Sequence, residues 1–356
     1  MLRKFSSDSL HSSLFTLILQ GDGAKANRHI PFVRREVNMS EKIKVLAVAG
    51  PTASGKTALG VALAKLLGGE VVSCDSMQIY KGMVIGTAAP DEAERDGVPH
   101  HMIGVVDPRV NYSAADYARD AGAVIEEISG RGKLPVLVGG TGLYLDALLK
   151  IRSFSDAAED PKLREKLREI AEREGAEKLH GMLREKDPEA AEAIHPNNVK
   201  RVVRALEVCL VTGRRKSELD REALTGEGRY DADVAVIDFA SRETLYGRIG
   251  KRVDIMLERG LRDEVASLLV AGMLPDGSTA AQAIGYREMI AHLRGETTLD
   301  EAAELIKKNT RNYAKRQMTW FRRYDAIRVT PDRDGGIVPP DVLAREIAEK
   351  IKQKAL

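Results

Sequence analysis

The residues best suited to chemistry in this chain lie in one short stretch, Gly50–Thr57, with the sequence GPTASGKT. It follows an apolar, β-prone run, Val45–Ala49, and precedes a run with leucines at helical spacing. Such loops bind phosphate, because backbone N–H groups and the helix N-terminus behind them face the anion. Lys56 would add a positive charge and Thr57 a hydroxyl group for Mg²⁺. The stretch predicts a site for a phosphate chain, and leaves open whether that chain belongs to ATP.

Two polar side chains follow other predicted strands. Asp75 comes directly after an apolar strand at 70–74, and Thr141 lies in the GGTG turn after the strand Leu134–Val138. The carboxyl ends of parallel strands line the ligand crevice in open α/β sheets, so both side chains should reach the phosphate site. Asp75 could act as a general base, bind Mg²⁺ through water, or cap a turn, and the GGTG segment could be a tight turn only. The Leu134–Val138 strand lacks the terminal Asp common in nucleotide hydrolases.

A basic segment near the C-terminus, Lys307–Arg323, carries seven positive residues and no carboxylate. Tyr313, Trp320 and Phe321 are interleaved with the charges. Cations and aromatic rings on one helix favour nucleic acid, because charges meet phosphates and flat side chains support unstacked bases. The alternative is a solvated basic face with its aromatic rings in the core. Arg248 and Arg252, one helical turn apart, could reach a pyrophosphate or form surface ion pairs.

Composition places further limits on the protein. The chain has 356 residues, with 55 Lys and Arg against 53 Asp and Glu, so its net charge of +2 predicts no partner. Its two cysteines lie far apart, which indicates a reducing compartment, no disulfide framework and no Cys/His zinc site. No apolar run approaches the roughly 18 residues of a membrane span. We therefore expect a cytoplasmic protein.

Alternating strands and helices predict an α/β fold, with a P-loop NTPase-like parallel sheet flanked by helices. We assign residues 41–151 and 231–356 to this catalytic core, the latter including the nucleic-acid-binding C-terminal helices. The charged, helix-forming residues 152–230 would be a mainly helical insertion domain. We interpret residues 1–40 as a disordered extension or a misassigned start; a mitochondrial presequence is the weaker alternative. We also expect a strand over His100–Val106, a helix opening at Gln282, and a long helix capped by Asp300.

Taken together, ordered blocks from about Lys42 to Asp325 resemble the tRNA dimethylallyltransferases. The blocks are GPTASGKT, DSMQIYKGMVIGTA, PHHMIGVVDP, YSAADY, LVGGTGLYLDALL, RALEV, QAIGYRE and KRQMTWFRR. Eight blocks in this order are far more specific than the phosphate loop alone. The chain has no C-terminal Cys/His pair of the kind found in the zinc finger of eukaryotic relatives, so it is similar to the bacterial type.

The resemblance implies transfer of a dimethylallyl group from dimethylallyl diphosphate to N6 of the adenosine at tRNA position 37. In that case Asp75 is the general base, Thr141 assists at the reacting centre, and Thr57 is a ligand of Mg²⁺. The implied diphosphate-binding residues are Gly50, Pro51, Thr52, Ala53, Ser54, Gly55, Lys56, Thr57 and Arg252.

The resemblance also implies contacts with the tRNA anticodon stem-loop and a monomeric enzyme. The implied tRNA-binding residues are Asp75, Ser76, Met77, Gln78, Thr141, Arg164, Lys200, Arg201, Val202, Val203, Arg204, Gln282, Ala283, Ile284, Gly285, Tyr286, Arg287, Lys315, Arg316, Gln317, Trp320, Arg322 and Arg323. The residues alone do not decide whether the basic strip Lys200–Arg204 binds RNA.

Three other functions stay open at this point. A small-molecule kinase that uses ATP shares the phosphate loop but does not need the basic C-terminal helix. A non-catalytic RNA-binding NTPase module needs that helix but leaves Asp75 and the GGTG turn without a role. Prenyl transfer to free AMP, ADP or ATP would need neither the helical insertion nor the basic helix.

Overall fold

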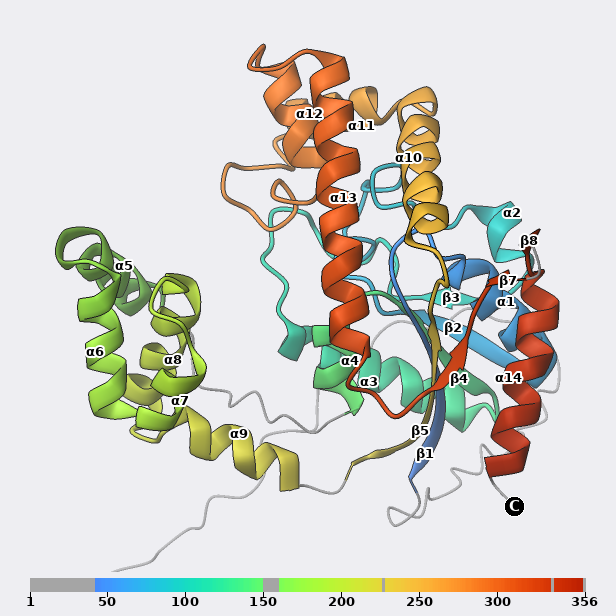
Figure 1. The fold of residues 1–356 in the computed structure, drawn as a ribbon, viewed down its shortest axis with the longest axis horizontal. Helices are drawn as coiled ribbons and strands as arrows, with labels where there is room; N and C mark the ends of the chain where they lie inside the picture. Colours follow the sequence, from blue (N-terminus) through green and yellow to red (C-terminus); the bar gives the residue numbers. More distant parts are fainter. Residues whose placement is uncertain (1–41, 150–159, 226–227, 334–335, 355–356) are drawn as a thin grey trace, which may run out of the picture. The chain divides into compact units, whose positions relative to one another are not determined.

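A parallel sheet of six strands organises the part of the chain that the computed structural model describes, residues 42–149, 160–225, 228–333 and 336–354 (Figure 1). The strand order is β3-β2-β4-β1-β5-β6, and every neighbouring pair is parallel. The strands are β1 (Ile43–Ala49), β2 (Gly69–Ser73), β3 (His100–His101), β4 (Leu134–Gly139), β5 (Tyr230–Ile237) and β6 (Ile327–Val329). The predicted α/β fold with a parallel sheet is confirmed.

Helices cover both faces of this sheet, which explains why its central strands β4 and β1 are mainly apolar. On one face, α1 (Lys56–Leu67) and α14 (Pro340–Lys354) pack together, and their side chains join those of Leu46 and Val48. On the other face, α3 (Ala114–Gly130) and α4 (Gly142–Leu149) share a core with Val45 and Ala47. The alternation along β1 therefore sends side chains into two different cores.

The carboxyl ends of β2, β4 and β1 lie at one edge of the sheet. Ala49 pairs with Gly139, and Ser73 pairs with Val138. Past the strand ends, the backbone N–H of Thr141 donates to the Cys74 carbonyl at 3.2 Å. The register thus brings together the three segments that the sequence analysis singled out: the phosphate loop, Asp75 and the GGTG turn.

Three expected elements differ in the structure. The strand expected over His100–Val106 has only two residues, because Met102 adopts a left-handed φ of 61° and the chain turns. The helix expected to open at Gln282 is α12 (Tyr286–Leu293), which follows Gly285 at a φ of 96°. The long basic helix is α13 (Leu299–Phe321), and its N-cap is Thr298 rather than Asp300. Thr298 forms a capping box with Glu301, whereas Asp300 already lies in the first turn of the helix.

The remaining helices and strands of the described core lie outside the six-stranded sheet. They are α2 (Glu92–Arg95), α10 (Arg242–Glu258), α11 (Leu261–Val270), β7 (Asp332–Arg333) and β8 (Gly336–Ile337). α10 and α12 both pack against α13. No helix in the described residues is long and apolar enough to cross a membrane.

Residues 160–225 are helical, as expected. The helices are α5 (Pro161–Glu174), α6 (Ala176–Lys186), α7 (Pro188–Ala193), α8 (Val199–Thr212) and α9 (Lys216–Thr225). They have a hydrophobic core of their own, formed around Leu167, Leu179, Leu183, Val202 and Leu206. A separate core is what an inserted domain needs; the predicted boundary at 152 lies outside the described residues, and the domain division stays a prediction.

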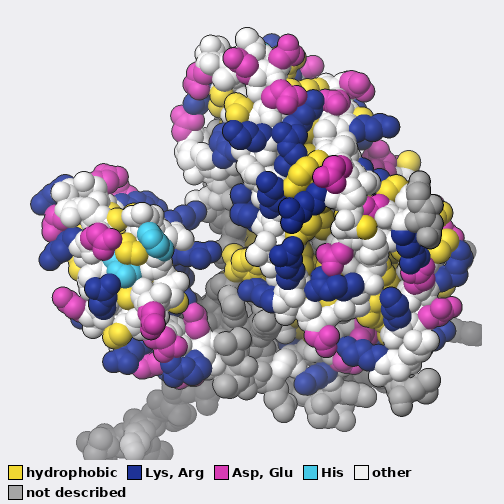
Figure 2. All heavy atoms as spheres, viewed as in Figure 1, with side chains coloured by type: hydrophobic (Ala, Val, Ile, Leu, Met, Phe, Trp, Pro, Cys, Tyr) yellow, Lys and Arg dark blue, Asp and Glu magenta, His cyan; other side chains and the backbone are white. Residues whose placement is uncertain are grey.

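The long helix α13 has two unlike faces. Ala314, Gln317 and Phe321 are buried, whereas Lys315, Arg316 and Arg322 are exposed. Figure 2 shows Lys and Arg side chains gathered over the part of the surface that α13 occupies in Figure 1. Both interpretations of the basic segment therefore hold in part, because its cations face solvent while part of its apolar face enters the core.

Candidate active site

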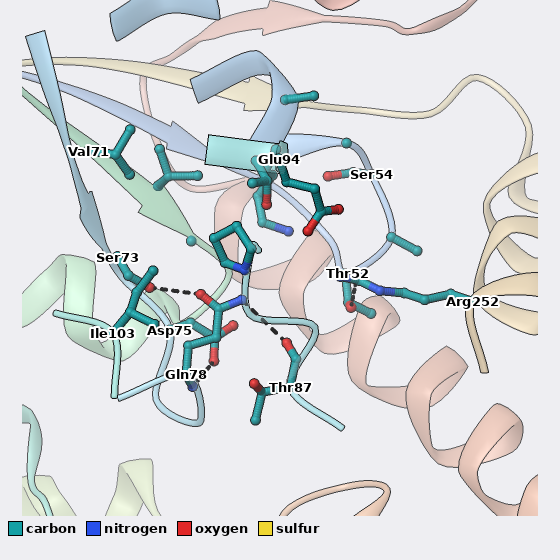
Figure 3. A pocket seen from close by; sticks show the side chains of 18 of the residues that line it. Thr52, Ser54, Val71, Ser73, Asp75, Gln78, Thr87, Glu94, Ile103 and Arg252 are labelled. Carbon is teal, nitrogen blue, oxygen red and sulfur yellow. Dashed lines mark hydrogen bonds between the residues drawn. The ribbon is translucent and has the colours of Figure 1, made fainter. Parts of the chain in front are cut away.

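A cavity of about 480 Å³ opens at the carboxyl edge of the sheet, beside the phosphate loop (Figure 3). Its wall comes from the loop itself, from the ends of β2 and β4, and from α10 and α13. Among the lining residues are Thr52, Ala53, Ser54, Gly55, Lys56, Thr57, Asp75, Gln78, Thr87, Arg248, Arg252, Tyr313 and Gln317. We call this space the first cavity.

The Gly50–Thr57 loop has the backbone that an anion site requires. Gly50, Ala53 and Gly55 all have positive φ, and a Cβ on Gly50 would lie 3.0 Å from the Ile237 carbonyl oxygen. In the described structure, no side chain caps the N-terminus of α1. Its first N–H groups are therefore available to a bound anion, and the helix dipole favours negative charge there.

Positive side chains converge on the first cavity. Lys56 is half-buried, and its Nζ donates to the Pro51 carbonyl at 2.6 Å. Arg248 donates to the Ala53 carbonyl at 2.8 Å, and Arg252 to the Thr52 hydroxyl at 3.4 Å. Burial, reinforced by the charge of Arg252, lowers the pKa of Lys56 to about 7, although Asp75 opposes the shift. Burial likewise lowers the pKa of Arg252. This concentration of positive charge suits a strongly anionic ligand.

The lowered pKa of Lys56 predicts that diphosphate binding takes up a proton. A bound anion favours the ammonium form, so the pKa of Lys56 should rise in the complex. Below about pH 7 Lys56 is already charged; above it, the dissociation constant of pyrophosphate should rise by up to about tenfold per pH unit. Metal-free titration calorimetry in buffers of different ionisation enthalpy measures both the affinity and the proton count. Lys56→Met should bind weakly with no proton uptake at this position, and a flat affinity from about pH 7 to 9 in the native chain would contradict the prediction.

Asp75 is held in a fixed orientation at the end of β2. Its Oδ1 accepts hydrogen bonds from the backbone N–H groups of Met77 at 2.9 Å and Gln78 at 3.3 Å. No hydrogen bond to its Oδ2 is found among the described residues. Asp75 thus caps a turn and also lines the cavity, so these two interpretations do not exclude each other.

Thr141 ties the GGTG turn to the Asp75 segment. Its Oγ1 accepts from the Ser76 N–H at 3.0 Å and donates to the Ser76 hydroxyl at 3.2 Å. The hydroxyl therefore lies one residue from Asp75, as the strand topology predicted.

A second cavity of about 450 Å³ meets the first one at Asp75. Five side chains line both: Thr52, Asp75, Thr87, Arg252 and Tyr313. The second cavity brings together residues predicted to bind tRNA from three segments: Ser76, Met77, Gln282, Ala283, Ile284, Gly285, Arg287 and Arg316. Tyr286 is fully buried, and its hydroxyl donates to Glu264 at 2.6 Å.

The predicted residues of α13 fall into two groups. Lys315, Arg316 and Arg322 are exposed. Gln317 is only 5% exposed, and Trp320 packs against Gly142. Arg323 lies 4.2 Å over the Trp320 ring and pairs with the buried Asp146.

The predicted residues of the helical segment are divided in the same way. Arg164 and Arg204 both pair with the buried Glu207, at 2.8 and 2.6 Å. Burial alone would raise the pKa of Glu207, but hydrogen bonds from Arg204 and Arg164 lower it. Lys200 and Arg201 are exposed, whereas Val202 and Val203 belong to the core.

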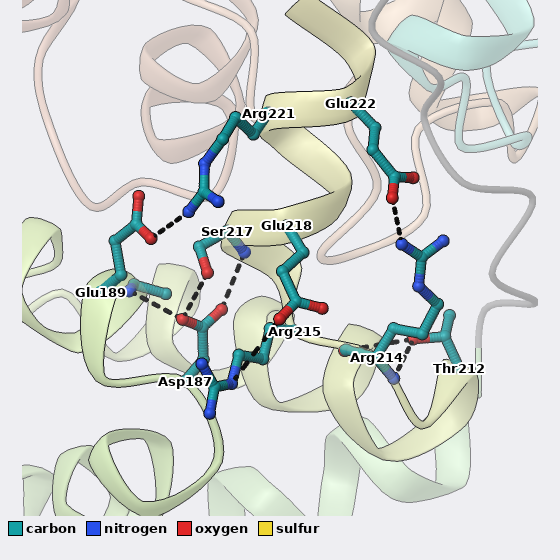
Figure 4. A network of polar contacts seen from close by, with 10 residues as sticks. Asp187, Glu189, Thr212, Arg214, Arg215, Ser217, Glu218, Arg221 and Glu222 are labelled. Carbon is teal, nitrogen blue, oxygen red and sulfur yellow. Dashed lines mark hydrogen bonds and ion pairs between the residues drawn. The ribbon is translucent and has the colours of Figure 1, made fainter.

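A second polar network joins α7 to α9 in this segment (Figure 4). The buried Asp187 caps α7 by accepting from the Ala190 N–H at 3.0 Å. It also accepts from the N–H and the hydroxyl of Ser217, at 2.8 and 2.7 Å. Buried carboxylates that are fully hydrogen-bonded in this way hold short helices in one arrangement.

Comparisons with known proteins agree with this geometry. A family model described as IPP transferase matches residues 78–324, and one described as isopentenyl transferase matches residues 43–104. The tRNA dimethylallyltransferase of Geobacter sulfurreducens is 50% identical over 287 residues, which cover 81% of this chain and 91% of that protein. The chain belongs to the tRNA dimethylallyltransferase family. Its relative from Geobacillus thermodenitrificans, with the same name, is 47% identical over 89% of this chain and 99% of that protein.

Solved structures of tRNA dimethylallyltransferases share the fold. A tRNA isopentenylpyrophosphate transferase from Staphylococcus epidermidis is 40% identical, with a TM-score of 0.63, over 87% of this chain and 99% of that one. A eukaryotic dimethylallyltransferase acting on tRNA is 31% identical, with a TM-score of 0.74, over 88% of this chain and 79% of that one. The resemblance drawn from the sequence blocks is therefore confirmed at the level of family and fold.

The described residues contain no group of three His, Cys, Asp or Glu side chains that could hold a metal. Mg²⁺ is usually bound by one or two protein ligands together with substrate phosphates and water. The Thr57 hydroxyl and the Asp75 carboxylate line the same cavity. These donors fit a metal that arrives with a diphosphate rather than one held by the protein alone.

Tyr313 is a residue of the candidate site that the sequence pattern indicated only as an aromatic ring. It lines both cavities, and burial, with the charge of Asp75, raises the pKa of its hydroxyl to about 12. Hydrogen bonds with Thr141 and Gln317 act in the opposite direction. The spacing of 313, 317 and 320 on one helix face could have indicated its inward position.

Proposed function

We propose that this enzyme transfers the dimethylallyl group of dimethylallyl diphosphate to N6 of adenosine 37 of tRNA, beside the anticodon, and releases pyrophosphate. The product would be N6-isopentenyladenosine in tRNA. The observation that carries the proposal is the junction of two unlike cavities at Asp75, one rich in phosphate-binding groups and the other lined by α12 and α13. A small-molecule kinase would also need an acceptor site, but it has no need of the exposed cations that α13 carries beside the second cavity.

The first cavity would hold the diphosphate. Loop N–H groups, Lys56, Arg248 and Arg252 would neutralise the negative charge that grows on the leaving pyrophosphate. Mg²⁺, bound through Thr57 and the diphosphate oxygens, would supply further neutralisation of that charge. By stabilising the leaving pyrophosphate, these groups favour cleavage of the bond between the allylic carbon and the diphosphate oxygen.

The second cavity would hold the acceptor base. Because a base inside its stack cannot reach this depth, adenosine 37 must be extruded into the cavity. A bond then forms between N6 and C1 of the dimethylallyl group, while the C1–O bond breaks and its electron pair leaves with pyrophosphate. The amine becomes cationic in this step, and Asp75 accepts its proton. Thr141 keeps the Asp75 segment in place through Ser76.

The exposed cations would bind the anticodon stem-loop. Lys315 and Arg316 lie on the solvent side of α13 and Arg322 is exposed at its C-cap, while Lys200 and Arg201 are exposed on α8. Positive side chains of this kind contact the RNA backbone. One chain supplies all of these groups, so we propose that the enzyme acts as a monomer in the cytoplasm.

The test uses labelled dimethylallyl diphosphate, unmodified tRNA and no ATP. We expect label in the RNA that requires Mg²⁺ and disappears when adenosine 37 is replaced by guanosine. Free AMP, ADP and ATP as acceptors form the parallel arm. Label only in free nucleotides, or a strict requirement for ATP, would overturn the proposal in favour of one of the other functions.

A further inference from the structure

One buried side chain of α13 joins two loops of the first cavity. The Oε1 atom of Gln317 accepts a hydrogen bond from the Thr52 backbone N–H at 2.8 Å. Its Nε2 atom donates to the Gly140 carbonyl at 2.9 Å. Thr52 belongs to the phosphate loop and Gly140 to the GGTG turn, so the amide connects the segments that follow β1 and β4.

The approach of α13 to these loops is unusually close. A Cβ on Gly140 would lie 2.1 Å from Gln317 Nε2, and a Cβ on Gly142 would lie 2.0 Å from the Trp320 ring. Both positions therefore need glycine for α13 to approach as it does. The packing leaves Gln317 5% exposed, and its two hydrogen bonds are made out of bulk water.

An amide suits this position because it is both a donor and an acceptor. A glutamate would still accept from the Thr52 N–H, but it would set a second oxygen against the Gly140 carbonyl. A methionine of similar length would leave both backbone groups without partners. Unpaired buried polar groups are costly, so the loop would rearrange to reach water.

We propose that Gln317 is a positioning residue that holds the Gly50–Thr57 loop in its diphosphate-binding conformation. The identity of the diphosphate rests on the proposed function, whereas the effect on the loop does not. Gln317 is then distinct from its neighbours Lys315 and Arg316, whose exposed charges face solvent. Its loss should weaken diphosphate binding and leave tRNA binding intact.

The experiment compares Gln317→Met with the native chain. Titration calorimetry with magnesium pyrophosphate, without tRNA, should show a dissociation constant raised by about 10- to 100-fold, which corresponds to the loss of two buried hydrogen bonds. The dissociation constant of unmodified tRNA should change by less than about twofold. Gln317→Glu should not restore pyrophosphate binding. Thr319→Ala, on an exposed position of the same helix, is the matched control and should change neither constant.

Unchanged pyrophosphate affinity in a folded Gln317→Met protein would overturn the proposal, and a loss of tRNA affinity alone would make Gln317 an RNA contact instead. Hydrogen exchange of the native chain provides a test without a variant, since the Thr52 amide should be protected. Hydrogen exchange of the Thr52 amide as fast as that of a solvent-exposed loop would also overturn the proposal. The two proposals can fail separately. If the native chain does not label tRNA but Gln317→Met still binds pyrophosphate more weakly, the proposed function is refuted and the positioning role of Gln317 is supported.

Discussion

Replacing Asp75 with asparagine is expected to lower the turnover of dimethylallyl transfer by about two to four orders of magnitude. Asparagine keeps an oxygen at the position that accepts from Met77 and Gln78, so the turn after β2 should persist. What it loses is the ability to take the proton from the attacking amine. The substitution therefore separates the role of Asp75 as a base from its role in the turn.

Single-turnover transfer from labelled dimethylallyl diphosphate measures this effect without interference from product release. The tRNA dissociation constant should stay within a few-fold of the native value, since the second cavity keeps its shape. A reduction in turnover smaller than about tenfold would show that another group accepts the proton. A parallel loss of tRNA binding would show that the Asp75 segment had rearranged.

Removing three charges from α13 is expected to weaken tRNA binding by roughly 10- to 100-fold and to reduce its salt dependence. The variant combines Lys315→Gln, Arg316→Gln and Arg322→Gln, all at exposed positions. Each lost phosphate contact lowers the slope of log K against log salt by about 0.7 to 0.9, so three contacts should reduce it by about two. Filter binding over a range of KCl concentrations gives both values.

The matched control removes three exposed lysines of α14, at positions 350, 352 and 354, with the same change of net charge. If both variants lose affinity equally, the effect is one of overall charge and α13 is not the RNA surface. Turnover at saturating tRNA should fall less than tRNA affinity, because Lys315 and Arg322 line neither cavity and only Arg316 lines the second one.

The position of the candidate site at the carboxyl edge of the sheet could be predicted from the sequence, for a physical reason. Strand ends in a parallel sheet share one edge, so Asp75 and Thr141 could be placed beside the phosphate loop from their positions alone. The residues that a side chain contacts far along the chain could not be predicted in this way, because nothing in the neighbouring sequence indicates them. Gln317 lies in a basic segment and was assigned to RNA, yet it contacts Thr52, 265 residues away.

The helical segment shows the same limit. Arg164 and Arg204 were both predicted to bind tRNA, and each pairs with the buried Glu207. Nothing near Arg164 in sequence indicates a partner 43 residues away. Charge pattern predicts that a side chain is polar, whereas the tertiary fold decides whether it faces solvent or a buried acid.

The junction of the two cavities has a consequence for inhibitor design. Thr52, Asp75, Thr87, Arg252 and Tyr313 line both spaces, so the two cavities are adjacent across these five side chains. Joining a diphosphate mimic to an adenine mimic makes the second binding event intramolecular, so the joined molecule gains affinity through effective concentration. Such a bisubstrate compound would bind across Asp75, where neither a nucleotide analogue nor a prenyl diphosphate alone makes full use of the enzyme.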